Sequence, residues 1–259
     1  MSVPGQLNPS PRILLGPGPS DVHPRVLRAM CTPLVGHLDP EFLAIMGETQ
    51  DMLRQVFRTK NQLTFPVSAT GMAGMEACVV NLIEPGDRMV VCVNGVFGQR
   101  MTDVAQRAGA AVTTLERPFG EVFDLDQIRA TLKKVRPKVL GIVHAETSTG
   151  AWQPVAELGG LCRETDTLLL LDTVTSLGGV PVDIDGWGVD AVYSGTQKCL
   201  SCPPGLSPVS FSSRGVEVIN RRKTKVQSWY LDMTMVQRYW GEERFYHHTA
   251  PITMIYALR

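Results

Sequence analysis

Four consecutive leucines followed by an aspartate constrain the fold of this chain more than any other feature. In the run Thr167-Leu168-Leu169-Leu170-Leu171-Asp172 every residue between the two ends is apolar. A strand that is apolar at each position has to be covered on both faces, as the inner strands of parallel sheets are. Ligands of such sheets bind beyond the carboxyl ends of the strands, which places Asp172 beside a crevice. A structural alternative is that Asp172 caps the start of a helix over the next residues.

Strand-like and helix-like segments alternate around this run. The expected strands lie at 63–67, 88–93, 111–115, 139–143, 167–172 and 189–193. The expected helices lie at 21–30 and 40–57, from about 74 to 83, from about 100 to 108, and at 125–135 and 154–164. This alternation over residues 63–212 predicts an α/β fold with a mostly parallel, doubly wound sheet and helices on both faces.

One lysine, Lys198, follows the strand at 189–193 in a loop of small, hydroxylated, glycine and proline residues. A lysine in a tight, partly desolvated loop loses its proton more readily, and a neutral amine attacks carbonyl groups to form a Schiff base. Pyridoxal phosphate needs such an amine, and it needs an acid that keeps its pyridine nitrogen protonated. Lys198 and Asp172 are candidates for these two roles, and an ordinary surface lysine is the plain alternative.

Other predicted strand ends carry residues that suit a flat, phosphorylated ligand. The small residues 68–74 lead from a strand into a helix, where free backbone N–H groups and the helix dipole favour a phosphate. Phe97 lies between glycines after another strand, in a position to stack on an aromatic ring. A polar cluster at 144–150 follows a third strand. A simple connection and ordinary core packing are the alternatives at 68–74 and at Phe97.

Composition excludes several classes of function. The 25 basic residues equal the 25 acidic ones, so no net field favours nucleic acid or an anionic membrane. The chain holds no apolar run of the length that spans a bilayer, and its first residues do not resemble a signal peptide. We therefore expect a cytoplasmic protein.

Cysteines and histidines do not form a metal pattern. Cys78, Cys92 and Cys162 lie in apolar segments, as buried thiols do. Cys199 and Cys202 form a C-x-x-C, a pattern typical of a redox-active pair or of half a zinc site, but no second C-x-x-C or suitably spaced histidine pair accompanies it. We expect neither a disulfide framework nor a metal site.

Seven short motifs stand in one order along the chain. They are Gly-Pro-Gly-Pro-Ser, Ser-Ala-Thr-Gly, Asn-Gly-Val-Phe-Gly-Gln-Arg, Ser-Thr-Gly, Leu-Asp-Thr-Val-Thr-Ser-Leu-Gly-Gly, Ser-Gly-Thr-Gln-Lys and Tyr-His-His-Thr. By these motifs the chain resembles the class V pyridoxal-phosphate aminotransferases, and most closely the alanine–glyoxylate and serine–pyruvate aminotransferases, from about Leu14 to Arg259. The resemblance implies the large domain of fold type I, with a mostly parallel sheet of seven strands.

The resemblance also implies roles for individual residues. Lys198 corresponds to the lysine that forms the Schiff base and later moves a proton, Asp172 to the acid at the pyridine nitrogen, and Val174 to the apolar residue on one ring face. Phe97 corresponds to the stacking aromatic residue, which is tryptophan in some members, and Thr147 to a hydroxyl near the ring oxygen. Positions that cradle the phosphate correspond to Thr70, Gly71, Met72 and Gln197. Met72 replaces a histidine found in some members.

Tyr246 and Thr249 correspond to residues that reach the cofactor of a neighbouring subunit, which implies a homodimer with shared sites. The implied substrates are small amino acids, alanine or serine, and the 2-oxo acids glyoxylate or pyruvate. We expect an N-terminal arm at 1–20 and a cofactor-binding large domain at 21–259. Members of the family continue into a smaller C-terminal domain with a carboxylate-binding arginine, so we expect this chain to be truncated. A peroxisomal or mitochondrial location is the alternative to the cytoplasm.

Three other readings compete with this one. Another class V reaction, such as ureidoglycine–glyoxylate transamination, is the nearest alternative, whereas cysteine desulfuration would need a mobile cysteine and Cys199 adjoins Lys198 too closely. A non-catalytic fragment that serves in dimerisation is a second reading. A nicotinamide-binding domain is the third, and it lacks the glycine fingerprint that such domains carry.

Overall fold

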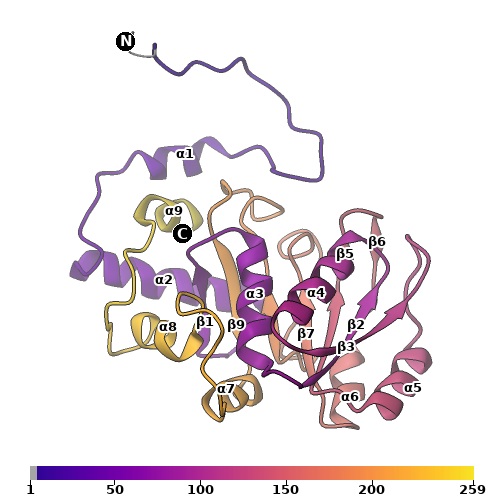
Figure 1. Ribbon diagram of the computed structural model, residues 1–259. Coiled ribbons are helices and arrows are strands. Elements are labelled where there is room, and N and C mark those ends of the chain that lie inside the picture. Colours follow the sequence, from indigo (N-terminus) through magenta and orange to yellow (C-terminus); the bar gives the residue numbers. More distant parts are fainter. Residues whose placement is uncertain (1–4) are drawn as a thin grey trace.

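A seven-stranded sheet between layers of helices forms the body of the molecule in the computed structural model, which describes residues 5–259 (Figure 1). The strands are β1 (Leu63–Val67), β2 (Arg88–Val93), β3 (Ala111–Glu116), β4 (Val139–Val143), β7 (Leu168–Asp172), β8 (Ala191–Tyr193) and β9 (Ser207–Phe211). Their order across the sheet is β1-β9-β8-β7-β4-β2-β3. Only β9 runs against its neighbours, so the expectation of a mostly parallel sheet of seven strands is confirmed.

Nine helices and a small two-stranded ribbon complete the part of the chain that the structure describes. The helices are α1 (Pro24–Met30), α2 (Pro40–Phe57), α3 (Gly71–Leu82), α4 (Val96–Arg107), α5 (Leu125–Val135), α6 (Leu158–Arg163), α7 (Ser213–Asn220), α8 (Met233–Trp240) and α9 (Ile252–Leu258). The ribbon pairs β5 (Ala145–Glu146) with β6 (Ala151–Trp152). No helix among residues 5–259 has the length and apolarity to cross a membrane.

The leucines of β7 alternate between two cores, one on each face of the sheet. Leu168 and Leu170 join the core under α3, α4, α7 and α8, and Leu169 and Leu171 join the core under α5 and α6. Each of the four is almost fully buried. Burial of one such side chain contributes about 1.5–3 kcal/mol, so this strand is the part of the sheet that both layers hold in place.

Several expected bounds differ from the structure. The helices expected from 21, from about 74 and from about 100 begin at Pro24, Gly71 and Val96, and the strand expected at 189–193 begins at Ala191. The predicted helix at 154–164 begins only at Leu158, and Ala156 and Glu157 before it form a turn. Strand β9 was not expected as a separate strand, since Ser207-Pro208-Val209-Ser210-Phe211 is neither continuously apolar nor free of proline. In the sheet all five residues of β9 are buried, and Pro208 lies opposite Pro66 of β1, so both strands lack an N–H at the same level.

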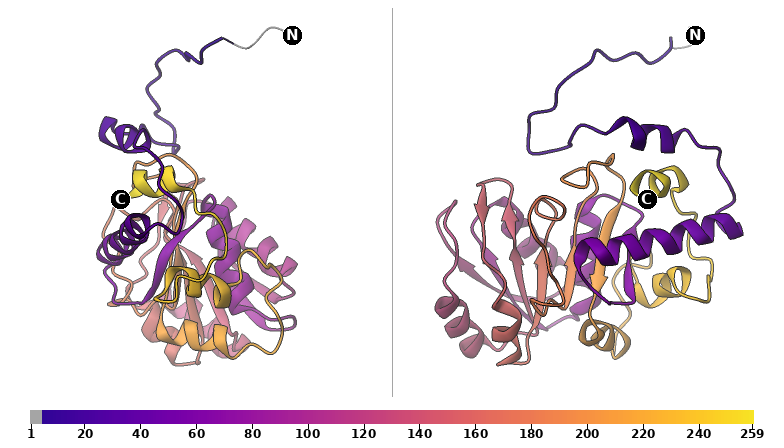
Figure 2. Two further views of the ribbon diagram at one scale, coloured as in Figure 1. Left: turned by 90° about the vertical axis from the view of Figure 1, so that its left-hand side faces the viewer. Right: turned by 180° about the vertical axis from the view of Figure 1, so that it is seen from behind.

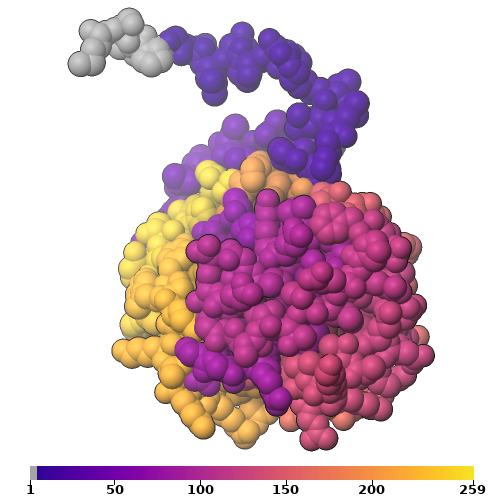
Figure 3. Space-filling model, turned by 45° about the vertical axis from the view of Figure 1, so that its right-hand side comes forward, coloured from indigo at the N-terminus to yellow at the C-terminus, as the bar shows by residue number. Residues whose placement is uncertain are grey.

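The N-terminal segment stands apart from the body. Residues 5–15 form an extended arm without helix or strand, and Leu7 and Leu15 each keep 90% of their surface exposed (Figures 1 and 2). The space-filling view shows this arm projecting from an otherwise compact molecule (Figure 3). The chain returns to the body at Gly16–Ser20, where Ser20 bonds to the loop of Lys198.

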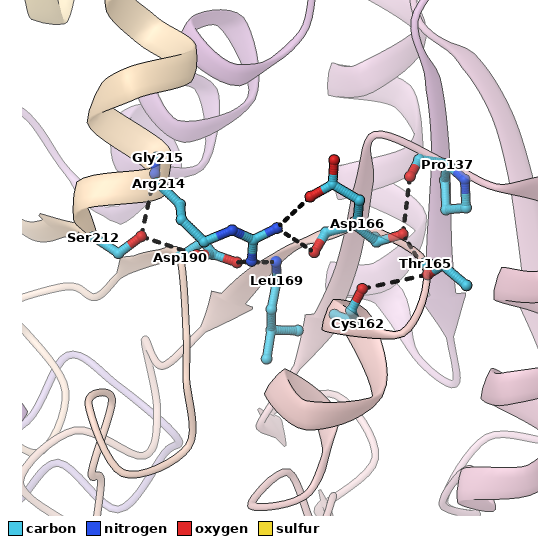
Figure 4. A network of polar contacts seen from close by, with 10 residues as sticks. Pro137, Cys162, Thr165, Asp166, Leu169, Asp190, Ser212, Arg214 and Gly215 are labelled. Carbon is cyan, nitrogen blue, oxygen red and sulfur yellow. Dashed lines mark hydrogen bonds and ion pairs between the residues drawn. The ribbon is translucent and has the colours of Figure 1, made fainter.

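The buried carboxylate of Asp190 joins several strands at the end of the sheet opposite to Asp172 (Figure 4). Asp190, which is 1% exposed, accepts hydrogen bonds from Leu169 N at 3.0 Å, Ser212 Oγ at 2.9 Å and Arg214 Nη1 at 3.1 Å. Arg214 also reaches Asp166 at 3.0 Å. Because Asp190 precedes β8 and Ser212 follows β9, one side chain joins the ends of three strands to the start of α7.

Removal of the guanidinium should therefore destabilise the fold. We expect Arg214→Ala to lower the free energy of unfolding by about 3 kcal/mol, since it leaves a buried carboxylate without its cation. Arg221→Ala is the matched control, because Arg221 pairs only with Glu217 on the surface and should cost less than about 0.5 kcal/mol. Urea denaturation measures both values. Equal losses in the two variants would contradict a stabilising ion pair between Arg214 and the buried Asp190.

Candidate active site

Asp172 ends β7 at the edge of the sheet where the other parallel strands also end. Its carboxylate is 2% exposed and accepts two hydrogen bonds, from Val174 N to Oδ1 at 2.8 Å and from the Tyr193 hydroxyl to Oδ2 at 2.6 Å. Asp172 and Tyr193 are register partners on β7 and β8. The helix-cap alternative for Asp172 does not apply, because residues 173–176 form a turn and no helix.

Burial dominates the electrostatics of Asp172. Loss of hydration raises the pKa of this carboxyl to about 6, since the charged form is the one that water would stabilise. The hydrogen bonds from Tyr193 and Val174 act in the opposite direction, as does the positive charge of Lys198, while Glu146 adds to the rise. The nearby Lys198 ammonium therefore belongs to the same electrostatic environment as Asp172.

Lys198 lies in the turn that follows β8, and the turn at Pro17–Ser20 packs on it. Its Nζ donates to the carbonyl of Pro17 at 2.7 Å, while the Ser20 hydroxyl donates to the carbonyl of Lys198 at 2.9 Å. Gly18 has a φ of +133°, and a Cβ there would lie 2.6 Å from Lys198 Nζ. Any side chain at position 18 would collide with Lys198, so the glycine of the Gly-Pro-Gly-Pro-Ser motif allows the backbone to approach the lysine closely.

Small residues surround Val174 between Asp172 and the start of α3. A Cβ on Gly71 or on Gly195 would come within 3.5 Å of a Val174 methyl group. Thr147 and Thr175 share a short hydrogen bond between their hydroxyls beside this space. The structure therefore brings Val174, Gly71 and Thr147 to the same end of the sheet as Asp172 and Lys198.

The N-terminus of α3 offers unpaired backbone donors. Thr70 is the N-cap of this helix, but its side chain makes no capping hydrogen bond. Such a helix start favours an anion. Beside it the amide of Gln197 is half-buried, and its Oε1 lacks a hydrogen-bond partner within residues 5–259. An anion needs donors, which the uncapped helix start provides and which the amide provides when its NH₂ group is turned to this side, so the residues present suit a phosphorylated cofactor.

Phe97 is held by a residue that the sequence reasoning placed only in a polar cluster. Glu146, which is 1% exposed, accepts from Phe97 N at 3.1 Å, Gly98 N at 3.3 Å and the Ser148 hydroxyl at 2.6 Å. A Cβ on Gly95 would lie 2.2 Å from Glu146 Cγ, so this glycine makes the approach of the carboxylate possible. Glu146 thus fixes the first turn of α4.

Arg100 was also missed, although it is part of a quoted motif. Its guanidinium carbon lies 4.9 Å from the centre of the Phe97 ring, and its Nη1 lies 4.0 Å from the sulfur of Met72. Met72 and Phe97 are therefore neighbours across the starts of α3 and α4, with an exposed cation above them. A helical spacing of three residues from Phe97 is the signal that places Arg100 on the same side of α4.

Tyr246 and Thr249 lie on the segment between α8 and α9. Their hydroxyls are 3.4 Å apart, and Tyr246 is 49% exposed. Within residues 5–259 neither bonds to Asp172 or Lys198. The intervening His248 donates or accepts at Ser68 Oγ over 2.7 Å, which ties this segment to the turn before Thr70.

The cysteines follow the expected pattern. All six are free, and Cys78, Cys92 and Cys162 are buried. Cys199 is exposed with its Sγ 3.2 Å from the carbonyl of Thr175, whereas Cys202 is buried against the carbonyl of Ala257. The two thiols of the C-x-x-C thus point to different partners beside the lysine loop.

Comparison with known proteins gives consistent matches over the chain. The family Aminotransferase class-V matches residues 19–259. Among curated proteins, the (S)-ureidoglycine–glyoxylate transaminase of Bacillus subtilis is 42% identical over 96% of this chain, and the alanine–glyoxylate aminotransferase of Drosophila melanogaster is 44% identical over the same share. This chain spans 64% of the length of each of these two proteins.

Solved structures agree with the sequence matches. The crystal structure of an alanine–glyoxylate aminotransferase from Nostoc sp. is 56% identical, with a TM-score of 0.98 over all of this chain and 68% of its own length. That of the ureidoglycine–glyoxylate aminotransferase from Bacillus subtilis is 44% identical, with a TM-score of 0.97 over 98% of this chain and 66% of its own length.

The raised pKa of Asp172 predicts a pH dependence of stability in the cofactor-free protein. The unfolded carboxyl ionises near pH 4 and the folded one near pH 6, so the native state loses about 3 kcal/mol of this contribution as the pH rises through that window. Asp172→Asn removes the contribution. We expect its free energy of unfolding to gain about 3 kcal/mol relative to wild type between pH 4 and pH 6.

The comparison with Asp172→Asn is needed because other groups titrate in the same range. Burial lowers the pKa of His144 and of His248 to about 4, so both destabilise the wild type and the variant alike as the pH falls from 6.5. Chemical denaturation at each pH gives the two curves. Parallel curves would contradict the assignment of a raised pKa to Asp172.

Proposed function

The chain belongs to the class V aminotransferases, and on that premise we propose that it is the cofactor-binding part of a pyridoxal-phosphate enzyme that transfers an amino group from alanine or serine to glyoxylate or pyruvate. The observation that supports this most is the placement of Asp172 and Lys198 at one end of the sheet, within electrostatic reach of each other. In this proposal residues 1–20 are an arm and residues 21–259 the large domain.

Each residue of the site has a part in the proposal. When bound, pyridoxal phosphate supplies an aldehyde for the amine and a ring that accepts electrons from the substrate. Asp172 would keep a proton on the ring nitrogen, because its buried carboxylate has acceptor positions left for a further donor. Val174 and Phe97 would hold the ring between them, and Thr147 would offer its hydroxyl to the ring. The phosphate would be held by Thr70, Gly71, Met72 and Gln197.

Lys198 carries the proton transfer in this scheme. Its Nζ would hold the aldehyde carbon of the cofactor in the resting protein, and as a free amine it would take up the proton that leaves the substrate α-carbon. The turn at Pro17 and Gly18 contacts Nζ directly, so it limits the positions that the amine can occupy.

The proposal extends to assembly and location. Tyr246 and Thr249 are exposed, and within residues 5–259 neither bonds to Asp172, as expected of residues that serve the cofactor site of a second copy in a homodimer. Six free thiols are typical of a reducing compartment, which favours the cytoplasm.

A second candidate is ureidoglycine–glyoxylate transamination. It is favoured by the 42% identity with the Bacillus subtilis enzyme, which is close to the identity with the alanine–glyoxylate enzymes. The two candidates share glyoxylate as acceptor and differ in the donor. Alanine, serine and ureidoglycine, each offered with glyoxylate and with pyruvate, distinguish them: transfer from ureidoglycine alone would replace our first choice, and transfer from alanine or serine would support it.

We expect Lys198→Ala to abolish the visible absorbance band that pyridoxal phosphate acquires on linkage to the protein, and to lower the rate of amino transfer by about 10³-fold or more. Lys225→Ala is the control, because Lys225 is an exposed lysine in a basic stretch far along the chain from Lys198. Absorbance titration with pyridoxal phosphate measures the effect. An unchanged band in Lys198→Ala, or no band in the wild type, would favour the non-catalytic fragment.

A further inference from the structure

Tyr193 places a phenol in the interior of the sheet, against the carboxylate of Asp172. The side chain is 0% exposed, on a strand whose residues are all buried. A buried hydroxyl costs free energy unless it is hydrogen-bonded. The Tyr193 hydroxyl has one hydrogen bond, to Asp172 Oδ2 at 2.6 Å, which is in the short range of bonds to an ionised acceptor.

The protein supplies one donor to each oxygen of Asp172. Val174 N occupies one position on Oδ1 and the Tyr193 hydroxyl one on Oδ2, so the plane of the carboxylate cannot rotate without breaking a bond. An ionised carboxylate has about four acceptor positions. Two remain for a further donor, which a protonated pyridine nitrogen would provide.

We propose that Tyr193 is a positioning residue for Asp172: its hydroxyl keeps the buried carboxylate ionised and fixed in rotation toward the ring nitrogen of the cofactor. This inference rests on the proposed function, since it gives Tyr193 a part in the same site. It adds a residue to which none of the motifs assigned a role.

Among the groups around Asp172, Tyr193 does most to favour the ionised carboxylate. Burial raises the pKa of Cys78 on α3 well above its ordinary value, so this thiol stays neutral, and His144 is neutral because burial lowers its pKa to about 4. Glu146 favours the protonated form of Asp172, and Lys198 the ionised form. Of the groups that oppose burial, Tyr193 contributes most, and its own pKa is raised so far that it remains a donor.

Tyr193→Phe tests the inference, because it removes the hydroxyl and keeps the ring in the core. The first measurement is the affinity for pyridoxal phosphate from pH 5 to pH 9. In the wild type, binding should weaken at acid pH as Asp172 takes up a proton near pH 6. In Tyr193→Phe we expect this acid limb to move up by about one pH unit and the affinity at pH 7 to fall by about 10-fold, as loss of a hydrogen bond to a charged group implies.

A second measurement needs no cofactor. The pH at which the cofactor-free protein loses the stability linked to Asp172 should move up in Tyr193→Phe by the same amount, because the folded carboxyl then holds its proton more tightly. Tyr256→Phe is the matched control. Tyr256 is also buried, but it lies on α9 and its hydroxyl donates to the carbonyl of Pro33 at 3.4 Å, so neither profile should shift.

The double variant Tyr193→Phe, Asp172→Asn keeps the inference testable if the single variant is unstable. Loss of the hydroxyl should cost much less thermal stability at pH 8 when position 172 carries no charge. An equal cost in both backgrounds, or an acid limb at the wild-type pH, would overturn the positioning role. If the wild type itself binds no pyridoxal phosphate, the proposed function fails instead, and the stability profile still decides whether Tyr193 controls the ionisation of Asp172.

Discussion

A carboxylate buried at the end of an apolar strand is the constraint on which the site depends. Asp172 follows four leucines that two cores hold from both sides, so its position is fixed by packing, and only 2% of its surface is exposed. Burial of the charged form is costly, and the fold offsets that cost with a backbone N–H and a buried phenol. An aspartate in this setting gains most from a cationic donor, which is the role that a protonated pyridine nitrogen takes in our proposal.

The fold could be predicted from the sequence where the residues of a single helix or strand carry the hydrophobic pattern of that element. The bounds of α2, α5 and β4 agree with the expected ones, because amphipathic spacing and continuous apolar runs are local signals. Strand β9 carries no such signal. Its two serines and its proline are tolerated because Ser207 donates to the carbonyl of Ser194 and Ser210 bonds to Thr64, contacts that exist only after distant strands have paired.

The candidate site divides in the same way. Lys198, Asp172 and the turn before α3 lie in motifs at strand ends, and the chemistry of those residue types suggested their use before any contact was known. Tyr193 and Glu146 could not be identified, because each acts through a partner 21 or more residues away, by the register of two strands or by the start of a distant helix. The structure thus adds the residues that hold the predicted ones in place, and the roles of both sets stay proposals.

The pairing of β1 with β9 has a consequence for how the chain is made. β1 is complete at Val67, yet its only partner in the sheet ends at Phe211. During synthesis at cellular rates this buried, apolar strand waits on the order of ten seconds before the residues that cover its edge exist. An uncovered strand edge of that kind is the surface on which chains associate wrongly, so assistance by chaperones would be needed most in this interval.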